Sequence, residues 1–313
     1  QTGRAGTGLL HSLIDGHSEV STLPSIYFSE YFDSSIWEKM TAGGWEEMTD
    51  RFIRTYPVLF DASAPDPVLS ISGTMLRSLG KEEGLCNVGE EKNETLTLDK
   101  DLFRTELNHL MDSYDHLDAL SFFKLVHIAF EKTVYGHYHK DTLFYHIHNP
   151  DIYAQLNFMR LAPNAQWVMM IREPVQSCES WVTEEYQKGD YNQVVQRIFM
   201  MFFEIDNIIF RKHSSIGVRL EDLKLHPEKT IKALCAWMGI EEEPGLYAMT
   251  AQGKKWWGDP SSPDFGKKGM DPFNPVSIKR KVGTIFSQND QYILKTLFYP
   301  FRVRFGYVEE DHD

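Results

Sequence analysis

The chain has 313 residues, of which 42% are hydrophobic and 25% charged, and its formal net charge is −13 at pH 7. This length and apolar content suffice for one large globular domain with a continuous core. A negative surface repels nucleic acid and anionic membranes, which argues against a polyanionic partner. Any small anionic ligand must therefore be held by a local cluster of basic side chains.

Cysteine content and hydropathy bear on the compartment. The three cysteines, Cys86, Cys178 and Cys235, are too few and too scattered for a disulfide framework. No signal peptide is recognisable, and no apolar run is long enough to span a bilayer. The most apolar stretch, IFMMFFEIDNIIF at 198–210, is short and carries two acidic residues, which predicts a buried amphipathic helix. We therefore expect a cytoplasmic protein with no membrane segment in this chain.

The chain opens on a glycine-flanked loop, GRAGTG at 3–8, that leads directly into an apolar helix. Leu9, Leu10, Leu13 and Ile14 have the spacing of one helix face. A helix that follows small residues directs free backbone N–H groups and the positive end of its dipole at the preceding loop. The opening therefore predicts an anion-binding loop.

The first half of the chain has mainly helical patterns after a short candidate strand at Val20–Thr22. Prolines in DASAPDPVLS predict a loop there. The polar, glycine-containing stretch Lys81–Thr97 predicts an exposed connection. The helices predicted in this half are 27–56, 101–114 and 119–135.

Strand and helix patterns alternate in the second half, which implies a three-layer α/β fold with a central parallel sheet. The predicted strands are TLFYHIHN at 142–149, AQWVMMI at 165–171 and IGVRLEDL at 216–223, and the predicted helices are 151–161, 174–186, 192–212 and 226–239. Ligands of such folds bind beyond the carboxyl ends of the strands. The opening loop and the turn after WVMMI are both expected there.

A second phosphate-binding pattern follows the strand WVMMI. Arg172 comes directly after this strand, and Ser180 lies in the next predicted helix. An arginine supplies a planar fork of donors, and a serine hydroxyl adds a neutral donor. Together they predict a grip on one phosphate group.

Four segments of the chain resemble the sulfotransferase family, in the order in which the family has them. GRAGTGLL is similar to the family's 5′-phosphosulfate loop, and IREPVQSCES to its 3′-phosphate motif. VRLEDLKLHPEKTIKALCAWMGI and KRKVGTIFSQNDQYILKTLF resemble the third and the C-terminal blocks. The carbohydrate, tyrosylprotein and bacterial branch is closer than the cytosolic steroid and phenol branch.

The resemblance implies a P-loop-like sulfotransferase fold over residues 1–313, one domain with a helical section at about 27–135 that shapes the acceptor pocket. It implies an enzyme of the EC 2.8.2 type that uses 3′-phosphoadenylyl sulfate (PAPS), releases 3′-phosphoadenosine 5′-phosphate (PAP) and needs no metal. The acceptor would be a hydroxyl of a carbohydrate, a peptide tyrosine or a small natural product. The donor-binding residues, carried over by position, would be Arg4, Ala5, Gly6, Thr7, Gly8 and Leu9 at the phosphosulfate, Arg172 and Ser180 at the 3′ phosphate, and Arg280 and Lys281 from the C-terminal loop.

Sulfuryl transfer, like phosphoryl transfer, places charge on the bridging oxygen of the leaving group, and Arg4 with the loop amides would stabilise it. A base must also take the acceptor's proton. Tyrosylprotein sulfotransferases carry a glutamate about where Ser25 stands, and a lysine before Asp-Pro where this chain has HIHNP. His148 takes the approximate place of that lysine and is the first candidate base, with Glu30 the second.

Acceptor contacts are expected from three further side chains. His146 shares a strand face with His148, and Trp256 and Trp257 would form a stacking wall, unless the two indoles only cover core. His137 and His139 form a His-x-His pair, but no standard metal pattern is completed nearby.

Two other functions stay open at this stage. One is a non-catalytic nucleotide-binding or interaction protein on a sulfotransferase scaffold, since Ser25 and HIHNP replace expected catalytic groups. A nucleotide kinase fits less well, because the Gly-Lys-Ser/Thr ending of a nucleoside-triphosphate loop is absent. The family also places a buried strand before the opening loop, where this chain has only Gln1-Thr2, so we expect that upstream residues are missing. An upstream anchor among them would place the protein in the Golgi lumen.

Overall fold

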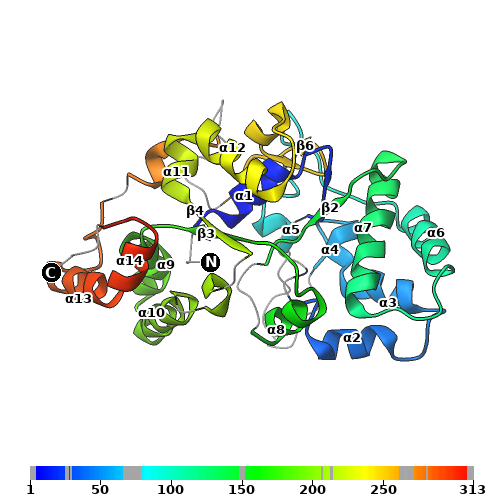
Figure 1. Cartoon of the computed structure of the whole chain (residues 1–313), viewed down its shortest axis with the longest axis horizontal. Helices are drawn as coiled ribbons and strands as arrows, with labels where there is room; N and C mark the ends of the chain where they lie inside the picture. The colour runs from blue at the N-terminus through cyan, green and yellow to red at the C-terminus, as the bar shows by residue number, and fades with distance from the viewer. Residues whose placement is uncertain are drawn as a thin grey trace. The chain divides into compact units, whose positions relative to one another are not determined.

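The computed structural model describes residues 5–24, 28, 30–65, 79–147, 152–205, 207–211, 214–260, 265, 271–279 and 281–308. This part of the chain contains helices and short strands (Figure 1). The chain divides into two compact units. The first unit takes its described residues from 1–7, 164–241 and 273–313, and the second unit from 8–163 and 242–272.

The first unit is built on a parallel strand pair, β3 (Trp167–Ile171) and β4 (Ser215–Arg219). Trp167 lies opposite Ser215 and Ile171 opposite Arg219, so both strands end at the same edge. Helices α9 (Pro174–Lys188) and α10 (Tyr191–Ile205) connect the two strands and pack side by side (Figure 1). The remaining helices of this unit are α11 (Leu220–Leu225), α12 (Pro227–Met238), α13 (Gln288–Leu297) and α14 (Tyr299–Arg304), with 3₁₀ turns at Ile208–Arg211 and Pro275–Ser277.

Local signals explain where the helices of the first unit begin and end. In both α9 and α12 a proline occupies the first turn, where its missing N–H costs nothing. Gly189 and Gly239 end these helices with φ values of 74° and 75°, which glycine adopts without strain. Ser287 starts α13 in a reciprocal capping box with Asp290.

The second unit holds a second parallel pair, β1 (Val20–Thr22) with β2 (Thr142–Phe144), and an antiparallel hairpin, β5 (Thr250–Ala251) with β6 (Lys254–Lys255). Helix α1 (Thr7–Ile14) begins at the last residue of the first unit's opening segment and continues in the second unit. The other helices of the second unit are α2 (Ser34–Thr41), α3 (Met48–Thr55), α4 (Pro57–Phe60), α5 (Leu79–Glu82), α6 (Lys100–Met111), α7 (Ala119–Tyr135) and α8 (Ile152–Leu161), with a 3₁₀ turn at Pro244–Tyr247.

The core of the second unit is rich in aromatic side chains. Phe52 stacks on Phe103 with ring centroids 6.0 Å apart, and Phe123 packs edge-on against Phe28 at 6.0 Å. Burying one such side chain stabilises a fold by about 2–3 kcal/mol. Helix α7 supplies much of this core, starting at the cap Asp118 and ending at Gly136 in the left-handed conformation.

Most of the predicted elements are confirmed, and four expectations need correction. The strand predicted at 142–149 ends at Phe144, so His146 lies beyond it. The segment 27–56 is not one helix, because Gly43 and Gly44 adopt φ values of 92° and 90° between α2 and α3. The helix predicted at 192–212 ends at Ile205, and it is not buried as expected, since Phe199 and Phe203 are 60% and 78% exposed. The strand predicted at 216–223 ends at Arg219, where the guanidinium binds Asp222 in the first turn of α11.

The connection Lys81–Thr97 is also more buried than predicted. Leu85, Val88 and Leu96 are buried in a cluster with Ala62 and Ala251. The parallel pairing of the strands agrees with the α/β prediction, whereas one continuous central sheet stays a prediction. Within the described ranges, no helix is both long and apolar enough to cross a membrane.

Candidate functional site

The first unit brings two of the predicted phosphate-binding segments to one edge of the β3–β4 pair. Arg172 directly follows β3 at this edge. Leu220 directly follows β4 at the same edge, and a β-carbon placed on Gly6 would lie 2.8 Å from Leu220 Cδ1. The opening loop therefore lies at the edge of the sheet where Arg172 emerges, although these segments are far apart in the sequence.

Gly6 is the residue that lets the loop approach this edge. It has a φ value of 86°, which L side chains rarely adopt, and a β-carbon there would require the side chain of Leu220 to shift. Thr7 then starts α1, whose first-turn N–H groups lack partners within the helix. These groups can bind an anion in the way that the sequence predicted. Arg4 lies outside the described residues.

Arg172 is buried, with 4% of its surface exposed. Its Nη2 donates to the carbonyl oxygen of Ser277 at 2.6 Å, and its Nε donates to Gln176 Oε1 at 3.2 Å. These bonds hold the plane of the guanidinium in one orientation. An oriented guanidinium can bind an oxyanion without first losing side-chain freedom.

The C-terminal loop contacts this arginine, and Ser180 lies further along α9. Ser180 is partly exposed and stands one helical turn after Gln176 on α9, so both lie on one helix face. The amide of Gln176 also donates to the carbonyl oxygen of Ile278 at 3.0 Å, which attaches the loop to the same face. Lys281 follows in this loop and is exposed, whereas Arg280 lies outside the described residues.

The second unit contains a small pocket that collects three residues predicted for the site. Gly8, His146 and Trp256 all line it. It contains about 350 Å³ of empty space, which includes its opening to solvent. The other lining residues are His11, Ser12, Asp15, Pro24, Glu83, Leu85, Thr250 and Ala251.

Two imidazoles lie together in this pocket, and the sequence predicted only one of them. The rings of His11 and His146 have centroids 5.3 Å apart. Burial lowers the pKa of His11, and the nearby Asp15 and the backbone of Leu23 offset part of this effect. His11 is therefore neutral near pH 7. Its position three residues after Gly8 on α1 is the signal that could have identified it, because such residues share a helix face.

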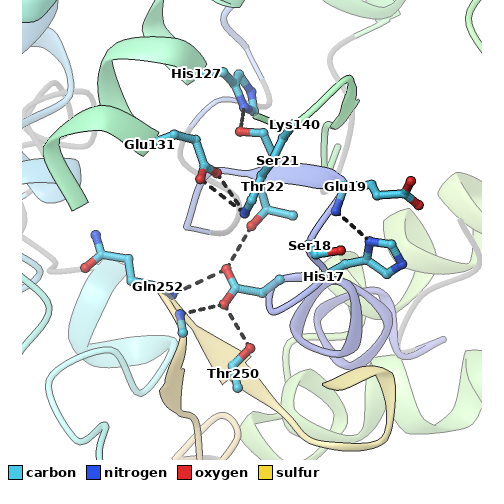
Figure 2. A network of polar contacts seen from close by, with 12 residues as sticks. His17, Ser18, Glu19, Ser21, Thr22, His127, Glu131, Lys140, Thr250 and Gln252 are labelled. Carbon is cyan, nitrogen blue, oxygen red and sulfur yellow. Dashed lines mark hydrogen bonds and ion pairs between the residues drawn. The ribbon is translucent and has the colours of Figure 1, made fainter. Parts of the chain in front are cut away.

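Asp15 lines the pocket and joins several segments of the second unit by hydrogen bonds. Its carboxylate accepts hydrogen bonds from the hydroxyls of Thr22 at 2.8 Å and Thr250 at 2.9 Å, and from the backbone N–H groups of Gln252 at 3.3 Å and Gly253 at 3.0 Å (Figure 2). These bonds join the end of α1 to β1 and to the β5–β6 hairpin. Asp15 therefore fixes the pocket wall that Thr250 and Ala251 form.

A second cluster of polar side chains joins β1 to α7. Ser21 Oγ is 2.9 Å from His127 Nδ1, and Lys140 Nζ is 3.1 Å from the carboxylate of Glu131 (Figure 2). Burial lowers the pKa of His127 to about 3, with smaller contributions from His11 and Lys140. Burial also raises the pKa of Glu131, against the effect of Lys140. His127 is therefore a neutral, hydrogen-bonded core residue.

The two tryptophans have different environments. The indole N–H of Trp256 donates to the carbonyl oxygen of Glu83 at 2.8 Å, and its ring lies near Gly8 in the pocket. Trp257 is buried, donates to the carbonyl oxygen of Gly89 at 2.6 Å, and is not among the pocket residues. The structure thus separates two residues that the sequence treated alike.

The remaining candidates lie apart from this pocket or beyond the described residues. Glu30 is exposed and does not line the pocket. His148 and Ser25 lie outside the described residues. Among the side chains that the structure places, no group of three or more histidine, cysteine or acidic residues is arranged to hold a metal ion.

Comparisons with known proteins identify the family and the fold of this chain. The model of the Sulfotransferase family matches residues 2–244. No curated protein sequence matches the chain. Among solved structures, the sulfotransferase domain from the Synechococcus PCC 7002 olefin synthase superposes with a TM-score of 0.54 at 16% identity, covering 96% of this chain and 92% of that chain. At this identity the likeness shows a shared fold.

Proposed function

Because the chain belongs to the sulfotransferase family, we propose that it transfers a sulfuryl group from PAPS to a hydroxyl acceptor. The observation that supports this most is the position of the opening loop, at the edge of the β3–β4 pair where Arg172 emerges. Two anion-binding segments at one edge suit a nucleotide that carries phosphate groups at both its 3′ and 5′ positions. We also propose that both units belong to one sulfotransferase domain, since the family match includes residues of each.

In this proposal the donor is held by the residues carried over from the family pattern. Arg4 and the backbone N–H groups from Ala5 to Leu9 bind the phosphosulfate. Arg172 and Ser180 bind the 3′ phosphate, and Arg280 and Lys281 bind from the C-terminal loop. The glycine at position 6 fits such a site, because a β-carbon there would collide with Leu220.

The proposed reaction is an in-line displacement. The acceptor oxygen forms a bond to sulfur, while the bond between sulfur and the bridging oxygen of PAPS breaks and PAP leaves. Negative charge grows on that bridging oxygen, and Arg4 with the first-turn N–H groups of α1 stabilises it. The proton of the acceptor hydroxyl passes to a protein base.

We propose His148 as this base and Glu30 as the second candidate. The pocket of the second unit is the proposed acceptor site, because Gly8 both ends the donor loop and lines this pocket. Trp256 would form its wall, while His146 and His11 would hydrogen bond to the acceptor. The buried position of Trp257 favours a structural role for that indole.

The experiment combines donor binding with turnover in the full chain. PAP binding is measured by calorimetry, and labelled PAPS is incubated with a panel of saccharides, tyrosyl peptides, phenols and alcohols. We expect PAP binding and transfer to at least one class of hydroxyl. The absence of both PAP binding and transfer contradicts the proposal. PAP binding without turnover, unchanged in His148→Ala and Glu30→Ala, would instead identify a non-catalytic nucleotide-binding protein.

A further inference from the structure

Glu179 is a buried carboxylate next to a predicted phosphate-binding residue. It precedes Ser180 on α9, and 6% of its surface is exposed. A negative charge here opposes the binding of a phosphate group, since like charges repel. A site that only had to bind phosphate would be better served by a neutral side chain at this position.

The contacts of Glu179 explain what its charge does. Its two oxygens accept hydrogen bonds from the backbone N–H groups of Gly283, at 3.0 and 3.1 Å, and of Thr284 and Phe286, both at 3.1 Å. Carboxylates form stronger bonds with backbone N–H groups than neutral acceptors do. One side chain thus fixes three residues of the C-terminal loop.

The loop is attached to the same face of α9 at further points. Ser277 accepts a hydrogen bond from Arg172, and Ile278 accepts one from Gln176. Arg172 precedes α9, and Gln176 and Glu179 are three residues apart on α9, so these two share one face of the helix. In the sequence, Lys281 lies between the two sets of attachments.

We propose that Glu179 is a positioning residue for donor binding. Its carboxylate holds the loop segment 283–286 so that Lys281, which precedes this segment, is presented to the 3′-phosphate site of Arg172 and Ser180. This inference rests on the proposed function and adds a residue that the family pattern did not supply. The repulsion between Glu179 and the phosphate is offset by the N–H groups that surround the carboxylate.

The variant Glu179→Gln separates the positioning role from a purely electrostatic role. Glutamine has nearly the same shape but only one acceptor oxygen, so the bonds to the loop cannot all be kept. A positioning role predicts PAP binding weaker by about tenfold or more, since bonds to a charged group are lost. A purely electrostatic role predicts the opposite, because removing a negative charge favours phosphate binding.

A second measurement follows the loop itself. Hydrogen exchange at the amides of residues 283–286 should become faster in Glu179→Gln, while exchange in α12 should stay unchanged. Glu184→Gln is the matched control, because Glu184 lies on the same helix, is 59% exposed and pairs with Lys188. This control should bind PAP with wild-type affinity and show wild-type exchange.

Gly283→Ala tests the same loop if Glu179→Gln does not fold. It leaves the carboxylate intact but strains a position with a φ of 123°, so we expect weaker PAP binding from it as well. The inference is overturned if the wild type binds PAP and Glu179→Gln binds it equally well or more tightly. It is also overturned if loop exchange is unchanged in that variant. Failure of the wild type to bind PAP would overturn the proposed function, which is a different result.

Discussion

Gly6 and Leu220 are in such close contact that a β-carbon on Gly6 would lie 2.8 Å from Leu220 Cδ1. This contact joins the opening loop to the residue that follows β4. It places the first predicted anion-binding segment at the edge where Arg172 follows β3. The contact is therefore a direct target for mutation.

Gly6→Ala should lower both stability and PAP affinity. The new methyl group would collide with Leu220, and alanine at a φ of 86° costs about 1–2 kcal/mol in addition. Urea unfolding and PAP calorimetry measure the two effects. Gly245→Ala is the control, since its β-carbon would make only an ordinary 3.5 Å contact with the carbonyl oxygen of Gly16. Equal losses in the two variants would contradict the importance of the Gly6–Leu220 contact.

Arg172→Lys should reduce the preference for a 3′-phosphorylated nucleotide. Lysine cannot keep the planar set of donors that reaches Ser277, Gln176 and a phosphate together. We expect the ratio of PAP affinity to adenosine 5′-phosphate affinity to fall about tenfold or more. Ser180→Ala should lower the same ratio by a smaller factor, because it removes a neutral donor.

Arg160→Lys provides the control for this prediction, since Arg160 is an exposed residue of α8. Its affinity ratio should equal that of the wild type. If Arg172→Lys weakens both nucleotides by the same factor, Arg172 does not read the 3′ phosphate.

Asp15→Asn should destabilise the second unit. The carboxylate is 4% exposed and accepts four hydrogen bonds, and an amide leaves at least one donor without its acceptor. We expect a loss of about 2 kcal/mol or more in the free energy of unfolding, measured with urea. Asp33→Asn is a suitable control because Asp33 caps α2 at the surface, and asparagine caps equally well. A loss no larger than in this control would show that the Asp15 network is not needed for stability.

The low pKa of His127 predicts that the folded protein loses stability in acid. Its pKa is about 3 in the folded protein and near 6.5 in an unfolded chain, so the unfolded state binds more protons between these values. The stabilising contribution is complete above pH 6.5 and decreases as the pH falls towards 3. At the acid end the accumulated loss of unfolding free energy is on the order of 5 kcal/mol.

This contribution is measured as the unfolding free energy of the wild type and of His127→Gln at pH values from 7.5 to 5. The wild-type curve should be steeper below pH 6.5, because glutamine does not titrate. His226→Gln, at an exposed position, is the control. Parallel curves for the wild type and His127→Gln would contradict the lowered pKa of His127.

Elements with strong local signals were predictable from the sequence. Proline in the first turn indicated the start of α9, glycine after the last turn indicated the end of α12, and short-range spacing predicted α6 and α7. The end of β4 was not predictable in this way. The local sequence at Leu220, Glu221 and Asp222 is compatible with either a strand or a helix. In the structure these residues are helical, and Arg219 forms an ion pair with Asp222.

Some of the proposed functional residues were predictable from local sequence, and others were identified only by the structure. The phosphate-binding pattern of Arg172 and Ser180 was evident from local sequence, and so was the glycine loop. Glu179 was not, because nothing near it in the sequence indicates that its carboxylate binds Gly283, Thr284 and Phe286. His11 also resembled an ordinary helix residue until its ring was found beside that of His146.

By itself, the sequence determined the family, the order of helices and strands and the residues that can hold an anion. These depend on side-chain type and on spacing within a few residues, where the geometry of a helix or strand applies directly. Only the tertiary structure decided that Gly6 contacts Leu220, that Trp256 lines a pocket while Trp257 is buried elsewhere, and that Glu179 holds a distant loop. Such contacts join residues about a hundred positions or more apart, and they form only when burial of apolar surface brings the segments together.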